Sequence, residues 1–96
     1  MKTVISGPVT ADVLDRAQLL MGITPTVFVT NGRSTPPIGL DLEVEVYPVC
    51  KMLGLDLGVI ARDWTLANNA DAAIIVGGND HLADCLRKYG LPVYEE

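Results

Sequence analysis

Apolar and polar residues alternate along this chain in blocks that predict short buried strands separated by helices. The clearest strand is an unbroken apolar run over residues 72–76, directly before two glycines. A run that is apolar at every position is typical of a strand buried on both faces, as in a parallel sheet. Similar runs predict four more strands, over residues 3–6, 26–30, 59–61 and 91–94. Pro92 places the last of these at an edge of the sheet.

Apolar residues at helical spacing predict helices between these strands. The first helix follows Thr10, which is a suitable N-cap, and ends at Gly22. The last covers residues 81–89, with Asp80 as its expected cap. A single helical turn is expected over residues 65–69.

Residues 38–53 fit two patterns. Apolar residues alternate with acidic ones up to Val46, which is the period of a strand. A helical stripe also runs from Leu42 to Leu53. Two parallel strands need a crossover connection between them, so we predict a helix over residues 41–53 that is irregular at Pro48. A strand remains the alternative interpretation for the first half of this segment.

The repeated order of strand and helix predicts the fold class. We expect an α/β protein: a Rossmann-like three-layer sandwich with a mostly parallel five-stranded sheet. The 96 residues predict one domain, residues 1–96.

Composition narrows the classes of partner. The chain is 49% hydrophobic, with a mean hydropathy of +0.31, which is high for so small a domain and favours a homo-oligomer. The net charge of −5 and an aromatic content of 5% argue against nucleic-acid binding. No apolar run approaches the length of a signal peptide core or a membrane span, which predicts no membrane contact. Cys50 and Cys85 have no metal-binding or disulfide spacing, so we expect buried thiols in the cytoplasm.

Polar and small residues follow the ends of the predicted strands. In a parallel sheet these ends meet at one edge, where ligands of open α/β folds usually bind. Glycines at such corners leave main-chain N–H groups open to a ligand, and the start of a helix favours an anion. The predicted ligand-binding residues are Ser6, Gly7, Asn31, Gly32, Arg33, Ser34, Trp64, Gly77, Gly78, Asn79 and Asp80.

Several of these side chains have both a chemical and a structural interpretation. Arg33 could clamp a phosphate or be a solvated loop residue. Trp64 could cover a nucleobase or fill a core or subunit contact. Ser6 and Ser34 have no recognisable base partner, which argues against a serine nucleophile.

The titratable residues give weaker signals. Asp63 and Asp84 could form an acid and base pair for glycosidic cleavage, although solvated surface carboxylates are the simpler interpretation. His81, the sole histidine, could join Asp80 and Asp84 around a metal ion. One histidine with two acids at a helix start is a weak metal signature, so we expect a solvated histidine and assign no metal or cofactor.

Four short motifs resemble one known group of proteins. They are Asn31-Gly32-Arg33 with Gly39-Leu40-Asp41, Ala61-Arg62-Asp63-Trp64, Ala70-Asp71-Ala72 leading into Val76-Gly77-Gly78, and Gly90-Leu91-Pro92-Val93. Together they resemble the SLOG superfamily, the Rossmann-like group that joins DprA-like and LOG-like proteins, and within it the small YspA/YpsA-related branch. The resemblance implies a Rossmann-like fold and a nucleotide-derived ligand.

The chain departs from that group at the glycine corner. The broader group often carries Gly-Gly-x-Gly-Thr-x-x-Glu, and here Asp80, His81 and Asp84 stand at the second half of the motif. Members that cleave N-glycosidic bonds rely on the glutamate, so Asp84 would have to replace it. A carboxylate at the position of Asp80 repels a phosphate unless a cation such as Arg33 intervenes.

Three hypotheses for function follow. The first is a small domain that binds a nucleotide or a nucleotide derivative, with a role as a sensor. The second is an N-glycosidase or a nucleoside deoxyribosyltransferase-like enzyme that uses Asp84 or Asp63. The third is a structural or interaction protein in which the ligand site has decayed.

Overall fold

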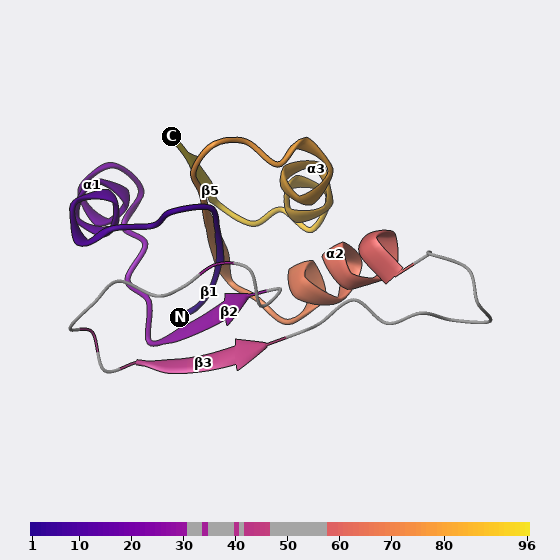
Figure 1. Cartoon of the computed structure of the whole chain (residues 1–96). Helices are drawn as coiled ribbons and strands as arrows, with labels where there is room; N and C mark the ends of the chain where they lie inside the picture. The colour runs from indigo at the N-terminus through magenta and orange to yellow at the C-terminus, as the bar shows by residue number, and fades with distance from the viewer. Residues whose placement is uncertain (31–33, 35–39, 41, 47–57) are drawn as a thin grey trace.

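A computed structural model describes residues 1–30, 34, 40, 42–46 and 58–96, and over residues 58–62 it describes only the backbone. The strands are β1 (Lys2–Ser6), β2 (Val27–Thr30), β3 (Glu43–Val46), β4 (Ala72–Ile75) and β5 (Val93–Glu95). The helices are α1 (Ala11–Met21), α2 (Gly58–Asn68) and α3 (Asp80–Lys88). Figure 1 shows the strands as one sheet between the helices. None of the described helices has the length and apolar character needed to cross a membrane.

The five strands form an all-parallel sheet in the order β3-β2-β1-β4-β5. Successive strands run outward from β1 to β3, and the chain then crosses back to place β4 on the other side of β1. β1 and β4 are therefore central, and all four residues of β4 are buried. The predicted α/β architecture with a five-stranded parallel sheet is confirmed.

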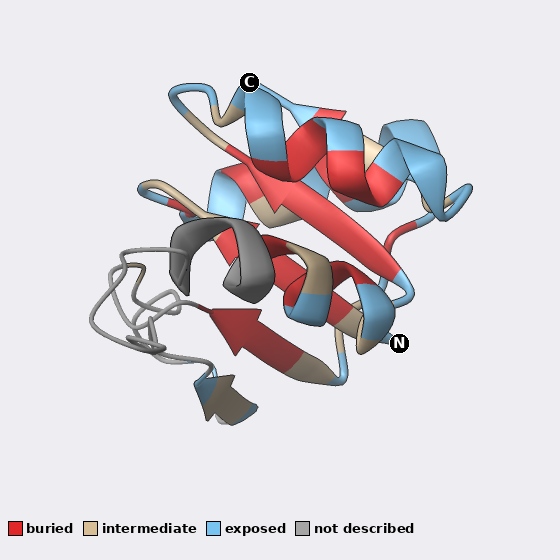
Figure 2. Ribbon diagram, turned by 90° about the vertical axis from the view of Figure 1, so that its right-hand side faces the viewer, coloured by how far each residue is buried: buried red, intermediate tan, exposed pale blue. Residues whose placement is uncertain are grey.

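Helices cover both faces of the sheet, with α1 on one face and α2 and α3 on the other (Figure 1). Side chains alternate along the central strands, so that Ile5 and Ile74 pack toward α1 while Val4 and Ile75 pack toward α2 and α3. Figure 2 shows buried residues along the strands and on the inward sides of the helices. This three-layer arrangement explains why the central strands are apolar at every position.

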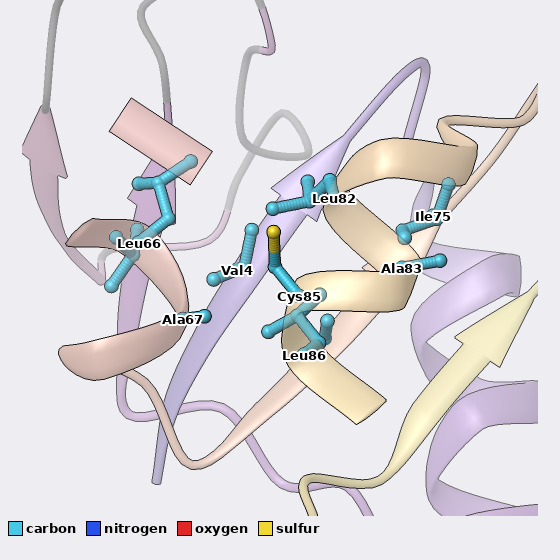
Figure 3. Close-up of a cluster of buried hydrophobic side chains, with 10 residues drawn as sticks. Val4, Leu66, Ala67, Ile75, Leu82, Ala83, Cys85 and Leu86 are labelled. Carbon is cyan, nitrogen blue, oxygen red and sulfur yellow. The ribbon is translucent and has the colours of Figure 1, made fainter. Parts of the chain in front are cut away.

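The core beneath α2 and α3 brings together side chains from both helices and the sheet. In Figure 3 Leu66 and Ala67 of α2 lie on one side of Val4 of β1, and Leu82 and Leu86 of α3 lie on the other. Leu66, Leu82 and Leu86 are each at most 2% exposed. Contacts of this kind fix the position of α2 relative to α3 and to the carboxyl end of β4.

The first helix has the predicted ends. The Thr10 hydroxyl accepts a hydrogen bond from the N–H of Val13 at 3.4 Å, which caps the first turn. Gly22 has a φ of 68° and donates its N–H to the carbonyl of Gln18 at 2.9 Å. A left-handed glycine of this kind is the usual end of a helix.

The prediction of a helix over residues 41–53 was wrong where the structure describes this segment. Residues Glu43–Val46 are β3, an edge strand that pairs only with β2. Its two valines alternate with Glu43 and Glu45, and Glu45 forms an ion pair with Lys2 at 3.0 Å. The alternative interpretation, a strand indicated by the period of two, is therefore correct for residues Glu43–Val46. The rest of the predicted helix, including Pro48 and Cys50, lies outside the described residues.

The prediction of a strand over residues 59–61 was also wrong. These residues lie in the first turn of α2, which continues through the predicted single turn at residues 65–69 as far as Asn68. An apolar run of three residues fits a buried helix as well as a strand, so its period alone does not distinguish them. The count of five strands was correct, although the strand identified between β2 and β4 was the wrong segment.

The last helix and strand follow the prediction closely. α3 runs over Asp80–Lys88, Gly90 follows it with a φ of 73°, and β5 begins at Val93. β5 is an edge strand that pairs only with β4, as Pro92 indicated. The chain therefore reaches the carboxyl edge of the sheet again beside the end of β4.

Candidate functional site

The sheet order reverses between β1 and β4, and in open α/β folds ligands bind at the carboxyl ends of the strands on either side of such a reversal. Here the two strand ends touch each other. The N–H of Val76, directly after β4, donates to the carbonyl of Ser6 at 2.8 Å. Gly7 has a φ of +82°, and a Cβ atom at this position would lie 1.9 Å from the carbonyl oxygen of Val76. Gly7 is thus needed for the contact between the two corners.

Ser34 lies at the same corner as Gly7. Its hydroxyl accepts the N–H of Gly7 at 3.0 Å, and its carbonyl accepts the hydroxyl of Thr30 at 3.3 Å. The structure therefore brings the predicted site residues Ser6, Gly7 and Ser34 together with the end of β4. It also shows that the N–H of Gly7 is already used within the protein.

The two glycines after β4 differ in what their N–H groups do. The N–H of Gly77 donates to the carbonyl of Glu96 at 3.0 Å, so it too is occupied. Gly78 has a φ of +84°, and its N–H has no hydrogen bond within the described part of the chain. The N–H groups of Asn79, Asp80 and His81 are likewise without an acceptor there, as expected for the first residues of a helix. This run is the set of open donors at the edge.

The N-cap of α3 is Asn79, so the prediction of Asp80 as the cap was wrong. The side-chain oxygen of Asn79 accepts the N–H of Leu82 at 3.3 Å, and its carbonyl accepts the N–H of Ala83 at 2.9 Å. Asp80 is the first residue of the helix, where its charge suits the helix dipole and its side chain is exposed. The two residues are adjacent and both are good caps, so the sequence pattern alone did not separate them.

A buried carboxylate lies directly beneath the start of α3. Asp63, in the middle of α2, is 1% exposed, and its Oδ2 lies 2.7 Å from Nδ1 of His81. The His81 side chain is 47% exposed, so the pair extends from the core to the surface. A buried carboxylate is costly unless it is paired, which gives this contact a structural role.

Cys85 completes this small cluster without adding a nucleophile. Its sulfur lies 3.9 Å from Nδ1 of His81, and the residue is 2% exposed. Burial raises the pKa of the Cys85 thiol, and the charge of Asp63 raises it further. Since the thiolate is the reactive form, burial makes Cys85 a poor nucleophile. The prediction of a buried thiol is confirmed for Cys85.

The sequence did not single out the contact between Asp63 and His81. Placing Asp63 after a strand rather than inside a helix concealed the signal. Once α2 is recognised, Asp63 precedes Leu66 and Ala67 by three and four residues, which places it on the inward face of the helix. An acidic residue on an apolar face calls for a partner, and His81 is one such partner of Asp63.

Other predicted site residues lie away from this edge or outside the described residues. Trp64 packs against Tyr89 with ring centroids 5.7 Å apart, and Lys88 lies 5.6 Å from the Trp64 ring. These contacts place the indole at the far end of α3 from Asn79. Asp84 is on the exposed side of α3, with a side chain that is 71% exposed and 4.0 Å from Arg87. Asn31, Gly32 and Arg33 lie outside the described residues.

A shallow hollow of about 200 Å³ lies elsewhere, between α1 and the segments before β2 and β3. Its lining includes Leu14, Ile23 and Leu42 and none of the predicted site residues. Within the described residues, no three histidine, cysteine, aspartate or glutamate side chains gather as metal ligands.

Comparisons with protein-family models, with curated proteins and with solved structures found no match to this chain. The resemblance to the SLOG superfamily therefore remains a proposal.

Proposed function

We propose that the chain binds a nucleotide or nucleotide-derived small molecule at the carboxyl edge of the sheet, beside the corners that follow β1 and β4. The observation that carries the proposal is the open run of N–H groups from Gly78 to His81, directly after β4 at the reversal of strand order. Donors at a helix start favour oxygen-rich groups such as phosphates and sugar hydroxyls. The open space around Gly78 allows a ligand to approach the main chain.

The resemblance to the SLOG superfamily supports the same ligand class. Asn31-Gly32-Arg33 come directly after β2 in the sequence, and β2 ends at the same edge as β1. In this proposal Arg33 supplies the positive charge that offsets Asp80 when a phosphate binds. Without the charge of Arg33, Asp80 would repel a phosphate, and the edge would favour the sugar and the base of a nucleotide instead.

We further propose that the protein works in the cytoplasm as a homo-oligomer. Cys85 is a free thiol, as expected in a reducing compartment. Three successive apolar residues at the end of α1 are exposed, namely Leu19 at 84%, Leu20 at 68% and Met21 at 42%. Contiguous exposed apolar residues of this kind favour a contact with another subunit.

The geometry gives less support to an N-glycosidase. Asp63 is covered by His81, whereas Asp84 faces solvent beside Arg87. A pair of catalytic carboxylates would have to face one bound substrate from separate sides. Binding without cleavage is therefore the function we propose first.

The binding proposal predicts a higher melting temperature in the presence of ligand. Purified protein is first analysed by native mass spectrometry, which reports a co-purified ligand and the number of subunits together. Adenine and guanine nucleotides are then added at increasing concentration. A ligand at 100 times its Kd stabilises the folded state by about 2.7 kcal/mol, a readily measured shift.

Two arginine variants make this test specific. Arg33→Ala should remove the shift, whereas Arg87→Ala, which changes an exposed charge at the end of α3, should retain it. If no nucleotide changes the melting temperature and no ligand co-purifies, binding is ruled out. The interaction protein would then be the favoured hypothesis.

A further inference from the structure

The contact between Asp63 and His81 fixes which ring nitrogen of His81 carries the proton. A carboxylate can only accept hydrogen bonds, so Nδ1 of His81, 2.7 Å from Oδ2 of Asp63, must be the donor. A neutral imidazole has a single N–H group. In this neutral form the other nitrogen, Nε2, is left with a lone pair and acts as an acceptor.

Nε2 is available to a ligand. Within the described part of the chain it makes no hydrogen bond, and the His81 side chain is 47% exposed. Asp63 by contrast has only 2% of its side chain exposed, so the carboxylate is shielded while the ring that it orients reaches the surface. The pair thus presents one oriented acceptor in the first turn of α3.

The side chains around His81 are also acceptors. Asp80 precedes it and Asp84 follows it by one turn, and both are exposed. The thiol of Cys85 is buried and faces Nδ1 rather than solvent. The surface at the first turn of α3 therefore combines main-chain donors with side-chain acceptors, and a ligand there needs N–H groups as well as oxygen atoms.

We propose that Nε2 of His81, held as an acceptor by Asp63, makes the site selective for nucleobases with an exocyclic amino group. This inference rests on the proposed function, because it assigns one contact of the nucleotide that the edge would bind. A base without the amino group leaves Nε2 without a donor. An acceptor deprived of its partner on binding weakens the complex by about tenfold.

The tautomer is tested by long-range ¹H–¹⁵N NMR at pH 8.5. The spectrum is unambiguous because His81 is the only histidine. We expect the Nδ1–H form in the native protein and its loss in Asp63→Leu, which removes the acceptor. Asp63→Asn retains an oxygen that can accept the same bond and should restore the Nδ1–H form. An Nε2–H tautomer in the native protein would overturn the proposal.

Selectivity is tested with two pairs of ligands that differ only in the amino group. Adenosine 5′-monophosphate is compared with purine riboside 5′-monophosphate, and guanosine 5′-monophosphate with inosine 5′-monophosphate, by isothermal titration calorimetry. We expect the amino member of at least one pair to bind about tenfold more tightly. His81→Phe should remove this preference, and Arg87→Ala in the last turn of the same helix should retain it.

The two ways of failing are distinguishable. If both members of each pair bind equally well to the native protein, the role of His81 is disproved while nucleotide binding stands. If neither member of either pair binds, the proposed function fails and this inference fails with it.

Discussion

At the scale of single residues, Gly7 and Gly78 have nearly the same φ, but a glycine is required at the two positions for different reasons. Gly7 has a φ of +82° and Gly78 a φ of +84°, so both are in the left-handed region that other residues seldom adopt. A Cβ at Gly7 would collide with the Val76 carbonyl, whereas nothing lies within 4 Å of a Cβ at Gly78. Gly7 is needed to join two strands, and Gly78 leaves open space at the candidate site.

This difference predicts unequal effects of the same substitution. Gly78→Ala should lower the free energy of unfolding by about 1–2 kcal/mol, the cost of a left-handed alanine. Gly7→Ala adds a collision with main chain that is held between β1 and β4, and should cost about 3 kcal/mol or more. Urea denaturation followed by circular dichroism measures both. Equal costs for the two variants would contradict the close approach at Gly7.

At the scale of helices and strands, two adjacent residues at the start of α3 stabilise the helix in different ways. Asn79 caps the helix, whereas Asp80 interacts with the helix dipole. Asn79→Ala removes the side-chain acceptor for the N–H of Leu82 and should lower the free energy of unfolding by about 1 kcal/mol. Asp80→Ala loses only a favourable charge in the first turn and should cost about 0.3 kcal/mol or less. Thermal denaturation resolves the two, because 1 kcal/mol shifts Tm by about 4–8 °C in a domain of this size. A larger loss in Asp80→Ala would show that the cap is misassigned.

The elements that the sequence predicted well are those with strong local signals. β4 and α3 combine an apolar run, glycines and a polar cap, and these signals all agree. β3 and α2 were misassigned because their decisive interactions are distant in sequence. β3 is held by pairing with β2, and α2 by its contacts with α3. Local pattern cannot show such contacts, and tertiary structure overrides it.

The candidate site was predictable to a similar extent. Glycine corners at strand ends identified Ser6, Gly7 and Gly77 as neighbours, because a parallel sheet brings those ends together. Which N–H groups stay open could not be deduced, since the partners of Gly7 and Gly77 are Ser34 and Glu96, far away in the chain. The pairing of Asp63 with His81 depended on a helix that the sequence pattern did not reveal.

For the molecule as a whole, the C-terminal residue joins α1 to the sheet. The Glu96 carboxylate accepts hydrogen bonds from the Arg16 guanidinium and, at 2.7 Å, from the Tyr94 hydroxyl. These bonds hold the pKa of Glu96 below its ordinary value, with Arg16 as the larger cause. The same carboxylate raises the pKa of Tyr94, chiefly through its hydrogen bond. Since Glu96 also pairs with Ile75 and Gly77 through its main chain, this network lies beside the candidate site.

The network predicts a specific dependence of stability on pH. A carboxylate whose pKa is lower in the folded state stabilises that state fully above its unfolded pKa, about 4.3 for glutamate, and the contribution is lost as pH falls through the folded pKa. Arg16→Gln should therefore be less stable than the native protein at pH 7, and the difference should shrink progressively below about pH 4. Tyr94→Phe, which keeps the buried ring but removes one donor to Glu96, should give a smaller difference in the same pH range. Urea denaturation of the three proteins between pH 7 and pH 2.5 measures both effects. Because the groups are exposed, 1 M salt should weaken the effect of Arg16→Gln, and a difference that stays constant with pH would show that the ion pair does not contribute to folding.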